Sequence, residues 1–207
     1  EEGARLYTTL DPEMQNILVA AAQAQLPAIE KRIKKPAKEP LQVAALTVDL
    51  DSNEVLALIG GRDFRNTQFN RASDSRRQIG STVKPFVYIP AMLEHDPLTA
   101  VLDEPFEWKS GRQSWRPKNY DGKTFGNVPY FFALAESLNI SAAKIGQEVG
   151  LPAVSKALKD AGVVTAIPNL PSLTLGALEL SALEVAQAYS TLARMGQGDL
   201  LHTLNRV

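Results

Sequence analysis

Residues 76–85 read Arg-Arg-Gln-Ile-Gly-Ser-Thr-Val-Lys-Pro, and they place Ser81 and Lys84 three positions apart after a polar, arginine-rich loop. Residues three apart share one face of a helix, so we expect a helix that begins near Ser81 and brings the Lys84 amine to the Ser81 hydroxyl. A hydroxyl is a weak nucleophile until a base takes its proton, and a neutral amine is such a base. The spacing therefore predicts a serine nucleophile with a lysine base.

This chemistry requires the pKa of Lys84 to fall from its ordinary value of about 10.4. The positive end of the helix dipole disfavours another cation in the first turn by roughly 0.3–1 kcal/mol. Val83, Phe86 and Val87 can desolvate the amine as well. The same helix start offers free backbone N–H groups, and that of Ser81 is suited to hold a developing oxyanion.

The serine–lysine spacing can also arise without a catalytic role. It recurs at Ser141 and Lys144, where the serine is typical of a helix N-cap. Ser81 could be another such cap. Ser137 and Asn139 form the one Ser-x-Asn pair of the sequence. This serine could pass a proton to a leaving amine and this amide could bind a peptide group, although the pair is also typical of a helix C-terminus closed by asparagine.

Composition excludes several other classes of function. The 207 residues carry a net charge of -1, so the whole molecule has no positive electrostatic field that would attract nucleic acid or an anionic membrane. Without cysteine there is no thiol nucleophile, disulfide or thiolate metal site. No pattern places His95 or His202 beside a serine, and no cluster has metal-ligand spacing, so we expect neither metal nor cofactor. No run approaches about 18 apolar residues, so any membrane anchor would lie outside these residues.

The N-terminal part is predicted to be a lead-in, residues 1–40, followed by the main domain, residues 41–207. Asp11 before Pro12 predicts the start of a helix, and prolines at 27 and 36 predict a connector over 27–40 with a solvated basic run. Two apolar runs, 41–50 and 54–59, predict an antiparallel hairpin. Because a lone hairpin is marginal, we expect further strands of its sheet beyond Val207.

The remainder of the chain is predicted to be mostly helical, which makes the fold class α+β. Residues 103–127 are predicted to be a long irregular loop. The expected helices cover residues 127–137, 141–149 and 152–161, and another follows a capping box that begins at Ser181.

Several stretches together carry a resemblance to a known family. They are Thr8-Thr9-Leu10-Asp11-Pro12, Asn70-Arg71-Ala72, the segment 76–85, Trp115-Arg116-Pro117-Lys118-Asn119-Tyr120-Asp121-Gly122, Glu136-Ser137-Leu138-Asn139-Ile140, Leu175-Gly176-Ala177-Leu178-Glu179-Leu180 and Glu184-Val185-Ala186-Gln187-Ala188-Tyr189. In this order, they resemble the transpeptidase domain of class A penicillin-binding proteins, most closely the bifunctional 1b type.

The resemblance implies the penicillin-binding protein transpeptidase fold, with its helical part and an incomplete antiparallel sheet. It implies a peptidoglycan D,D-transpeptidase in which the D-alanyl-D-alanine end of a stem peptide acylates Ser81. Lys84 would be the general base, Ser137 would relay a proton with Lys84, and Asn139 would hold the peptide. β-Lactams would be trapped as acyl-enzymes. The resemblance further implies a periplasmic location, an anchor elsewhere in the parent chain and an upstream glycosyltransferase domain.

The family's third motif, Lys-Thr-Gly on a flanking strand, is not found before Val207. We therefore expect an active parent protein and impaired activity in residues 1–207 alone. Two alternatives stay open. One is a non-catalytic penicillin-binding or sensor module with the same fold. The other is a serine β-lactamase, which would need a deacylating glutamate after Asn139 with a nearby asparagine, and that pattern does not occur.

Overall fold

The computed structural model describes residues 3–33, 39–111 and 113–206. They belong to two compact units. The first takes residues from the stretches Glu1–Arg76, Ala161–Val163 and Leu180–Val207, and the second from Arg77–Asp160 and Val164–Glu179. The chain is therefore mixed α+β, as the sequence predicts, but each unit is built from separated stretches of chain.

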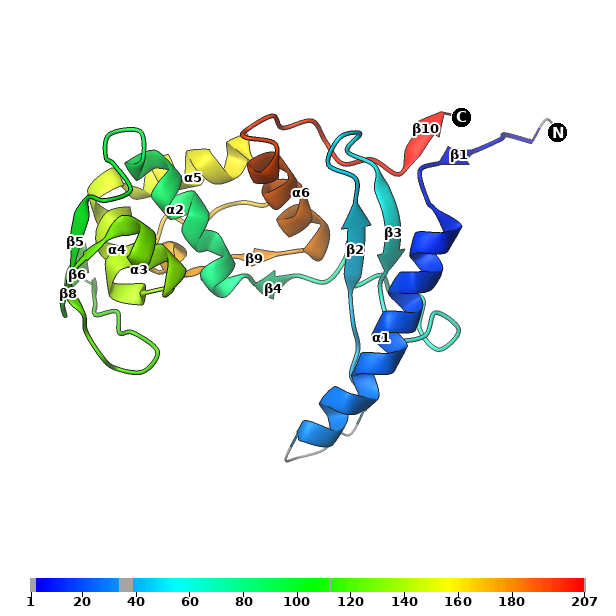
Figure 1. The fold of residues 1–207 in the computed structure, drawn as a ribbon, viewed down its shortest axis with the longest axis horizontal. Helices are drawn as coiled ribbons and strands as arrows, with labels where there is room; N and C mark the ends of the chain where they lie inside the picture. Colours follow the sequence, from blue (N-terminus) through cyan, green and yellow to red (C-terminus); the bar gives the residue numbers. More distant parts are fainter. Residues whose placement is uncertain (1–2, 34–38, 112, 207) are drawn as a thin grey trace. The chain divides into compact units, whose positions relative to one another are not determined.

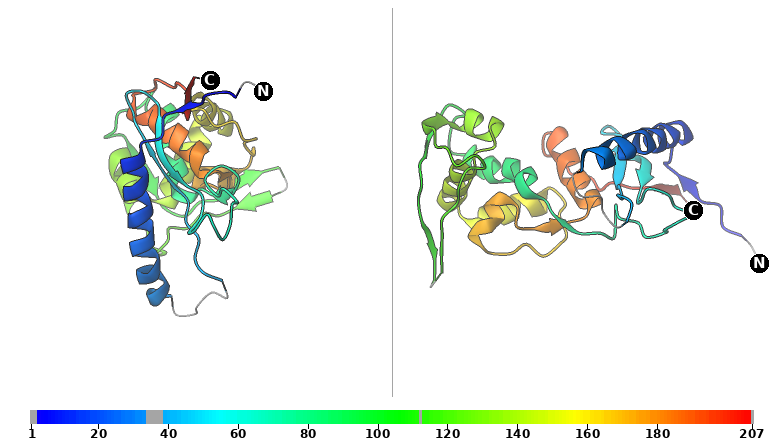
Figure 2. Two further views of the ribbon diagram at one scale, coloured as in Figure 1. Left: turned by 90° about the vertical axis from the view of Figure 1, so that its right-hand side faces the viewer. Right: turned by 90° about the horizontal axis from the view of Figure 1, so that it is seen from below.

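The first unit is a helix-covered hairpin. Its elements are β1 (Tyr7–Thr8), α1 (Pro12–Arg32), β2 (Ala45–Val48), β3 (Val55–Ile59), α6 (Ala182–Ala193) and β10 (Leu204–Arg206). β2 and β3 pair antiparallel, as predicted, and β1 pairs with β10 (Figure 1). α1 packs against β3, and α6 packs against β2. In both views of Figure 2, α1 lies beside the hairpin.

The start of α1 confirms its prediction, but its end does not. The Asp11 carboxylate accepts the backbone N–H groups of Glu13 and Met14, so it is the N-cap. The predicted break at Pro27 is wrong, because α1 continues to Arg32. Pro27 lies on an exposed face, where water can bond the carbonyl freed by its missing N–H. Residues 34–38 of the predicted basic connector lie outside the described residues.

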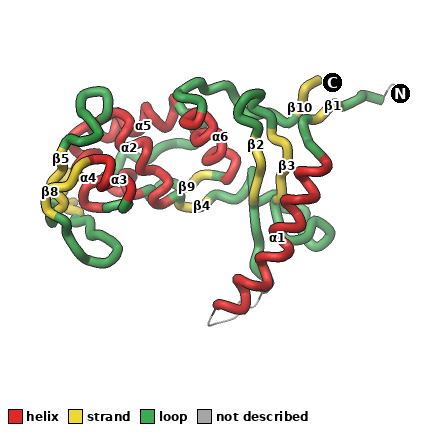
Figure 3. Tube along the Cα trace, in the orientation of Figure 1, coloured by secondary structure: helices red, strands yellow, loops and turns green. Residues whose placement is uncertain are grey.

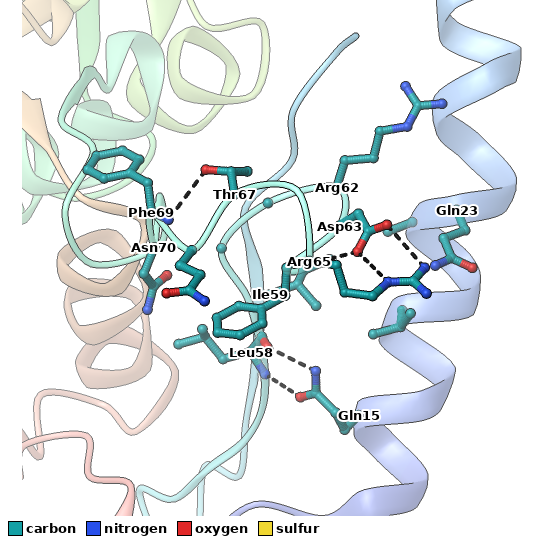
Figure 4. Close-up of a pocket in the computed structure, with 16 residues that line it drawn as sticks. Gln15, Gln23, Leu58, Ile59, Arg62, Asp63, Arg65, Thr67, Phe69 and Asn70 are labelled. Atoms are coloured by element: carbon teal, nitrogen blue, oxygen red, sulfur yellow. Dashed lines mark hydrogen bonds and ion pairs between the residues drawn. The ribbon is translucent and has the colours of Figure 1, made fainter.

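A cavity of about 520 Å³ lies in the first unit between α1, the end of β3 and the loop 60–70 (Figure 4). The Gln15 side chain borders the cavity and forms two hydrogen bonds with the backbone of β3, as a neighbouring strand would. Its Nε2 donates to the Leu58 carbonyl at 3.0 Å, and its Oε1 accepts the Leu58 N–H at 2.9 Å. The outer edge of β3 is thus hydrogen-bonded at this residue by a side chain rather than by another strand.

The second unit carries the predicted serine helix. Its helical elements are η1 (Gly80–Val83), α2 (Lys84–Ala91), α3 (Tyr130–Ala135), α4 (Asn139–Val149), α5 (Leu151–Asp160) and η2 (Pro171–Leu175). α2 packs on α4 and α5, and α4 packs on η2, which makes a helical core with Val87, Ile145 and Leu158 fully buried. Figure 3 shows α2, α3, α4 and α5 grouped together.

Most of the described residues in the predicted loop 103–127 are irregular, but short strands lie within it and at its ends. They are β5 (Ala100–Asp103), β6 (Trp108–Ser110), β7 (Gln113–Trp115) and β8 (Gly126–Pro129). β5 pairs with β8, and β6 pairs with β7 by placing Trp108 opposite Trp115. The β5–β8 pairing does not follow from local residue preference, because it depends on cross-strand neighbours. β6 and β7 are close in the sequence and form a local hairpin. Two further short strands are β4 (Arg77–Gln78) and β9 (Glu179–Leu180), the second of which spans a boundary between the units.

Gly176 lets the backbone approach the start of η1 closely. The Gly80 N–H donates to the Gly176 carbonyl at 3.2 Å, and the Ile79 N–H donates to the Leu178 carbonyl at 3.0 Å. Gly176 has a φ of +78°, and a Cβ there would lie 2.0 Å from the Gly80 carbonyl oxygen. No other residue fits this position, so the segment after η2 holds the turn that carries Ser81.

We predict that Gly176→Ala destabilises the protein far more than Gly122→Ala. Gly122 has a similar φ of +73° but no atom within 4 Å of an added Cβ. Both substitutions add a backbone penalty of about 1–2 kcal/mol, while only Gly176→Ala adds a backbone clash, worth at least ~1–3 kcal/mol more. Denaturant unfolding measures the difference. Equal losses of stability in the two variants would contradict the close approach.

Candidate active site

The Ser81 turn is a short 3₁₀ helix. The Lys84 N–H donates to the Ser81 carbonyl, a three-residue bond that confirms a helix start near Ser81 and shows a tighter first turn than an α-helix. Side chains three residues apart are eclipsed in a 3₁₀ helix, so Lys84 follows Ser81 on the same face. The Ser81 side chain is exposed, and neither its hydroxyl nor its backbone N–H is hydrogen-bonded to another described residue.

Lys84 is buried, with 1% of its surface exposed. Its Nζ donates to the Ser137 carbonyl, to the Ser137 Oγ at 2.9 Å and to the Asn139 Oδ1 at 2.7 Å. Burial lowers the pKa of Lys84 to about 8. The direction agrees with the expected desolvation, because removing water disfavours the charged amine.

The three acceptors around Lys84 match the three N–H donors of an ammonium group. A neutral amine has one lone pair and only two N–H groups, so loss of a proton leaves one contact to be rearranged. The Ser137 carbonyl and the Asn139 amide oxygen can only accept. The Ser137 hydroxyl is the one partner that can reverse and donate to the amine. The arrangement can therefore move a proton between Lys84 and Ser137.

Ser137 stands in a strained backbone conformation, with a φ of +54°. It lies two residues after the end of α3, directly after the C-cap Glu136. The Ser137 N–H donates to the Leu134 carbonyl, and the Leu138 N–H donates to the Ala133 carbonyl. These two bonds define a Schellman motif, whose left-handed position usually holds glycine. The predicted helix C-terminus is therefore present, although the left-handed residue is Ser137 rather than Asn139. The same serine closes the helix and contacts Lys84.

Asn139 is the first residue of α4, two residues before the predicted start. Its side chain is oriented at both ends, because its Nδ2 donates to the Lys118 carbonyl at 2.9 Å while its Oδ1 accepts from Lys84. The N-cap predicted at Ser141 is wrong. Ser141 lies inside α4, and its buried hydroxyl donates to Asp103 at 2.9 Å. Lys144 binds the Leu102 carbonyl instead of Ser141.

Asn119 and Asp103 form hydrogen bonds that hold the start of α4, which carries Asn139. The sequence did not predict either role. The Asn119 Oδ1 accepts the N–H groups of Asn139 and Ile140, at 2.8 and 3.1 Å. Its Nδ2 donates to the Asp103 carboxylate at 2.7 Å. Asn119 lies in one of the stretches that carry the family resemblance, but nothing in the sequence connects it to a helix that begins 20 residues later.

A cavity of about 520 Å³ adjoins this network. Asn119 and Ile140 form part of its wall, together with Phe106 and Arg116. Arg116 is paired with Glu107 at 3.3 Å. The cavity thus offers both apolar surface and charge beside the residue that anchors α4.

The histidines lie apart from the serine–lysine arrangement. His95 pairs with Glu148 at 2.9 Å and stacks edge-on against Tyr130, and the His202 carbonyl accepts the Val55 N–H in the first unit. The described residues hold no group of three or more histidine, cysteine, aspartate and glutamate side chains suited to a metal ion. Within the same residues, no helix has the length and apolar character needed to cross a membrane.

Comparison with known proteins identifies relatives along the full chain. Penicillin-binding protein 1B of Vibrio cholerae is 38% identical over 100% of this chain, and that of Escherichia coli is 34% identical over 99%. The chain spans about a quarter of these relatives, 27% and 25% of their lengths. Among solved structures, penicillin-binding protein 1A of Haemophilus influenzae matches 76% of this chain and 24% of its own, with 28% identity and a TM-score of 0.70.

The fold has a second structural parallel in PonA1 of Mycobacterium tuberculosis, solved in complex with penicillin V. It matches 97% of this chain and 54% of its own, with a TM-score of 0.77 and 23% identity. The family model described as the penicillin binding protein transpeptidase domain matches residues 43–206. The chain therefore belongs to the penicillin-binding protein transpeptidase family.

Proposed function

We propose that this chain is the catalytic part of a peptidoglycan D,D-transpeptidase that crosslinks stem peptides through an acyl-enzyme on Ser81. The observation that carries the proposal is the buried amine of Lys84, held by Ser137 and Asn139 and following the exposed Ser81 in one turn. Membership of the transpeptidase family supplies the reaction class. The geometry supports the assignment of residues to its steps.

The acylation step begins when Lys84 takes the proton of the Ser81 hydroxyl. The Ser81 oxygen attacks the carbonyl carbon between the two terminal D-alanines, and the negative charge develops on the carbonyl oxygen. The free N–H of Ser81 is suited to stabilise that charge. The C–N bond then breaks, and the proton passes from Lys84 through the Ser137 hydroxyl to the departing D-alanine amine. The peptide is left as an ester on Ser81.

Transfer reverses this order with a new amine. The amine of a second stem peptide attacks the ester carbonyl and loses a proton to Lys84, by way of Ser137. The Ser81–acyl bond breaks, and the Ser81 oxygen recovers a proton. The product is a peptide crosslink between two stem peptides. Asn139 is assigned to binding the donor peptide, although its amide is also committed to Lys84 and to the Lys118 carbonyl.

This function places the site outside the cytoplasm, at the periplasmic face of the inner membrane, where peptidoglycan is made. A membrane anchor and an upstream glycosyltransferase domain would belong to the parts of the relatives that this chain does not span. β-Lactams, which resemble the donor peptide, would acylate Ser81 and remain there. A non-catalytic penicillin-binding or sensor module would share the acylation step but would not transfer the acyl group to an amine.

We predict that a labelled penicillin forms a covalent adduct on the peptide that contains Ser81, in the full-length protein. Ser81→Ala removes the nucleophile and should abolish the adduct, whereas Ser141→Ala, the second serine of the same spacing, should leave it. Mass spectrometry of the digested protein measures both. An adduct retained in Ser81→Ala would overturn the assignment of the nucleophile, and labelling without peptide crosslinking would favour the sensor module.

We predict that the rate of penicillin acylation rises with pH. Only the neutral amine of Lys84 can accept the serine proton, and burial sets its pKa at about 8. The rate constant should increase about tenfold per pH unit at acidic pH and level off above this pKa. Stopped-flow acylation at a series of pH values gives the midpoint. A flat profile through this range would rule out Lys84 as the titrating base.

We predict that Ser137→Gly is more stable than Ser137→Ala, but that both variants are acylated more slowly than the unaltered protein. Glycine tolerates the φ of +54°, so Ser137→Gly should be about 1–2 kcal/mol more stable than Ser137→Ala, which keeps the strain. Both variants lack the hydroxyl and should acylate more slowly, on the order of 10²-fold. Thermal unfolding and acylation kinetics separate the two effects. A Ser137→Gly variant with the original rate would show that the hydroxyl is not a proton relay.

A further inference from the structure

Asn119 is a buried side chain with four hydrogen bonds, and only 6% of its surface is exposed. Its oxygen accepts two backbone N–H groups at the start of α4. Its nitrogen donates to Asp103 at 2.7 Å and to the Lys123 carbonyl at 2.9 Å. Both N–H groups of the amide and both lone pairs of its oxygen are therefore used.

α4 depends on Asn119 for its N-cap. Its own N-cap residue, Leu138, has no side chain that could accept a hydrogen bond. The first N–H groups of a helix lack partners within the helix, so they need an acceptor from elsewhere. Asn119 supplies it from 20 residues upstream. The first residue that it caps is Asn139, whose side chain binds Lys84.

We propose that Asn119 is a positioning residue of the active site, which fixes where Asn139 presents its amide oxygen to the Lys84 amine. The proposal rests on the function proposed above. The side-chain hydrogen bonds of Asn119 go to Asp103, Lys123, Asn139 and Ile140 and not to Lys84. Asn119 acts through Asn139, by holding the backbone from which that side chain extends.

The orientation of the Asn119 amide is set by its surroundings. Asp103 is fully buried, and its carboxylate also accepts the Phe125 N–H and the Ser141 hydroxyl. The carboxylate and the Lys123 carbonyl can only accept, so they select the nitrogen of Asn119. The oxygen must then face α4. An aspartate at 119 would place a second carboxylate against Asp103, and an alanine would leave the helix N-terminus without its cap.

The test uses the full-length protein and three variants. Asn119→Ala removes the cap. Asn119→Asp keeps a side chain of the same size but places a carboxylate against the Asp103 carboxylate and the Lys123 carbonyl, so it disturbs the cap. Ser141→Ala is the matched control, because it also removes a buried hydrogen bond to Asp103 but leaves the α4 N-terminus capped. Labelled penicillin gives two quantities for each variant. The amplitude of labelling counts folded sites, and the rate constant reflects the geometry of each folded site.

We expect Asn119→Ala to lower the acylation rate constant by on the order of 10- to 100-fold, because a small displacement of a catalytic group has effects of this size. The midpoint of the pH–rate profile should also shift to lower pH, since an ammonium that loses an acceptor is less favoured. Ser141→Ala should lose a similar amount of stability and keep its rate and midpoint. Asn119→Asp should also lose rate, because its carboxylate is repelled by Asp103.

Asn119→Ala sites that acylate at the original rate and midpoint, with only the amplitude reduced, would overturn the proposal. So would an equal loss of rate in Ser141→Ala, because rate would then follow general stability. If Asn119→Ala does not fold, Asn119→Asp decides, and acylation of its folded sites at the original rate and midpoint counts against the proposal. Absence of any adduct on Ser81 in the unaltered protein would instead defeat the proposed function.

Discussion

A buried ammonium group must be surrounded by acceptors, and this constraint on Lys84 organises the helical unit. Three oxygens from Ser137 and Asn139 meet its Nζ. Burial disfavours the charged form of the Lys84 amine, while the three hydrogen bonds fix its position. A lysine that is both desolvated and oriented is suited to exchange protons near neutral pH, which an ordinary surface lysine is not.

The oxygens stay in place because the backbone around them is held against local preference. Ser137 occupies a left-handed position that favours glycine, and Gly176 brings a distant segment against the start of η1. The N-terminus of α4 is capped by Asn119 rather than by its own N-cap residue. Strained or externally supported residues of this kind gather at functional sites, where surrounding structure compensates for them. Here Ser137 contacts the Lys84 amine directly, and Asn119 holds the backbone of Asn139, whose side chain also contacts it.

Local patterns in the sequence predicted the elements that depend on neighbouring residues. The N-cap at Asp11, the hairpin at 41–59, the serine helix and the capping box at Ser181 are all present. The site residues Lys84, Ser137 and Asn139 come together as expected. Their roles in catalysis stay predictions.

Two of the missed features depend on partners far away in the chain. β5 and β8 pair across residues 104–125, and no local signal marks that pairing. The cap of α4 comes from Asn119, so the serine that looked like a cap, Ser141, serves Asp103 instead. α1 continues past the predicted break at Pro27, because water can bond the carbonyl that this exposed proline leaves free.

The protonation of Lys84 is the central claim, and an NMR titration of the full-length protein labelled at lysine Cε tests it most directly. One resonance, absent from a Lys84→Arg variant, should titrate with a pKa of about 8. An unperturbed lysine side chain titrates at about 10.4. If the Lys84 resonance titrates at that ordinary value, burial does not lower its pKa, and the account of Lys84 as the general base is contradicted.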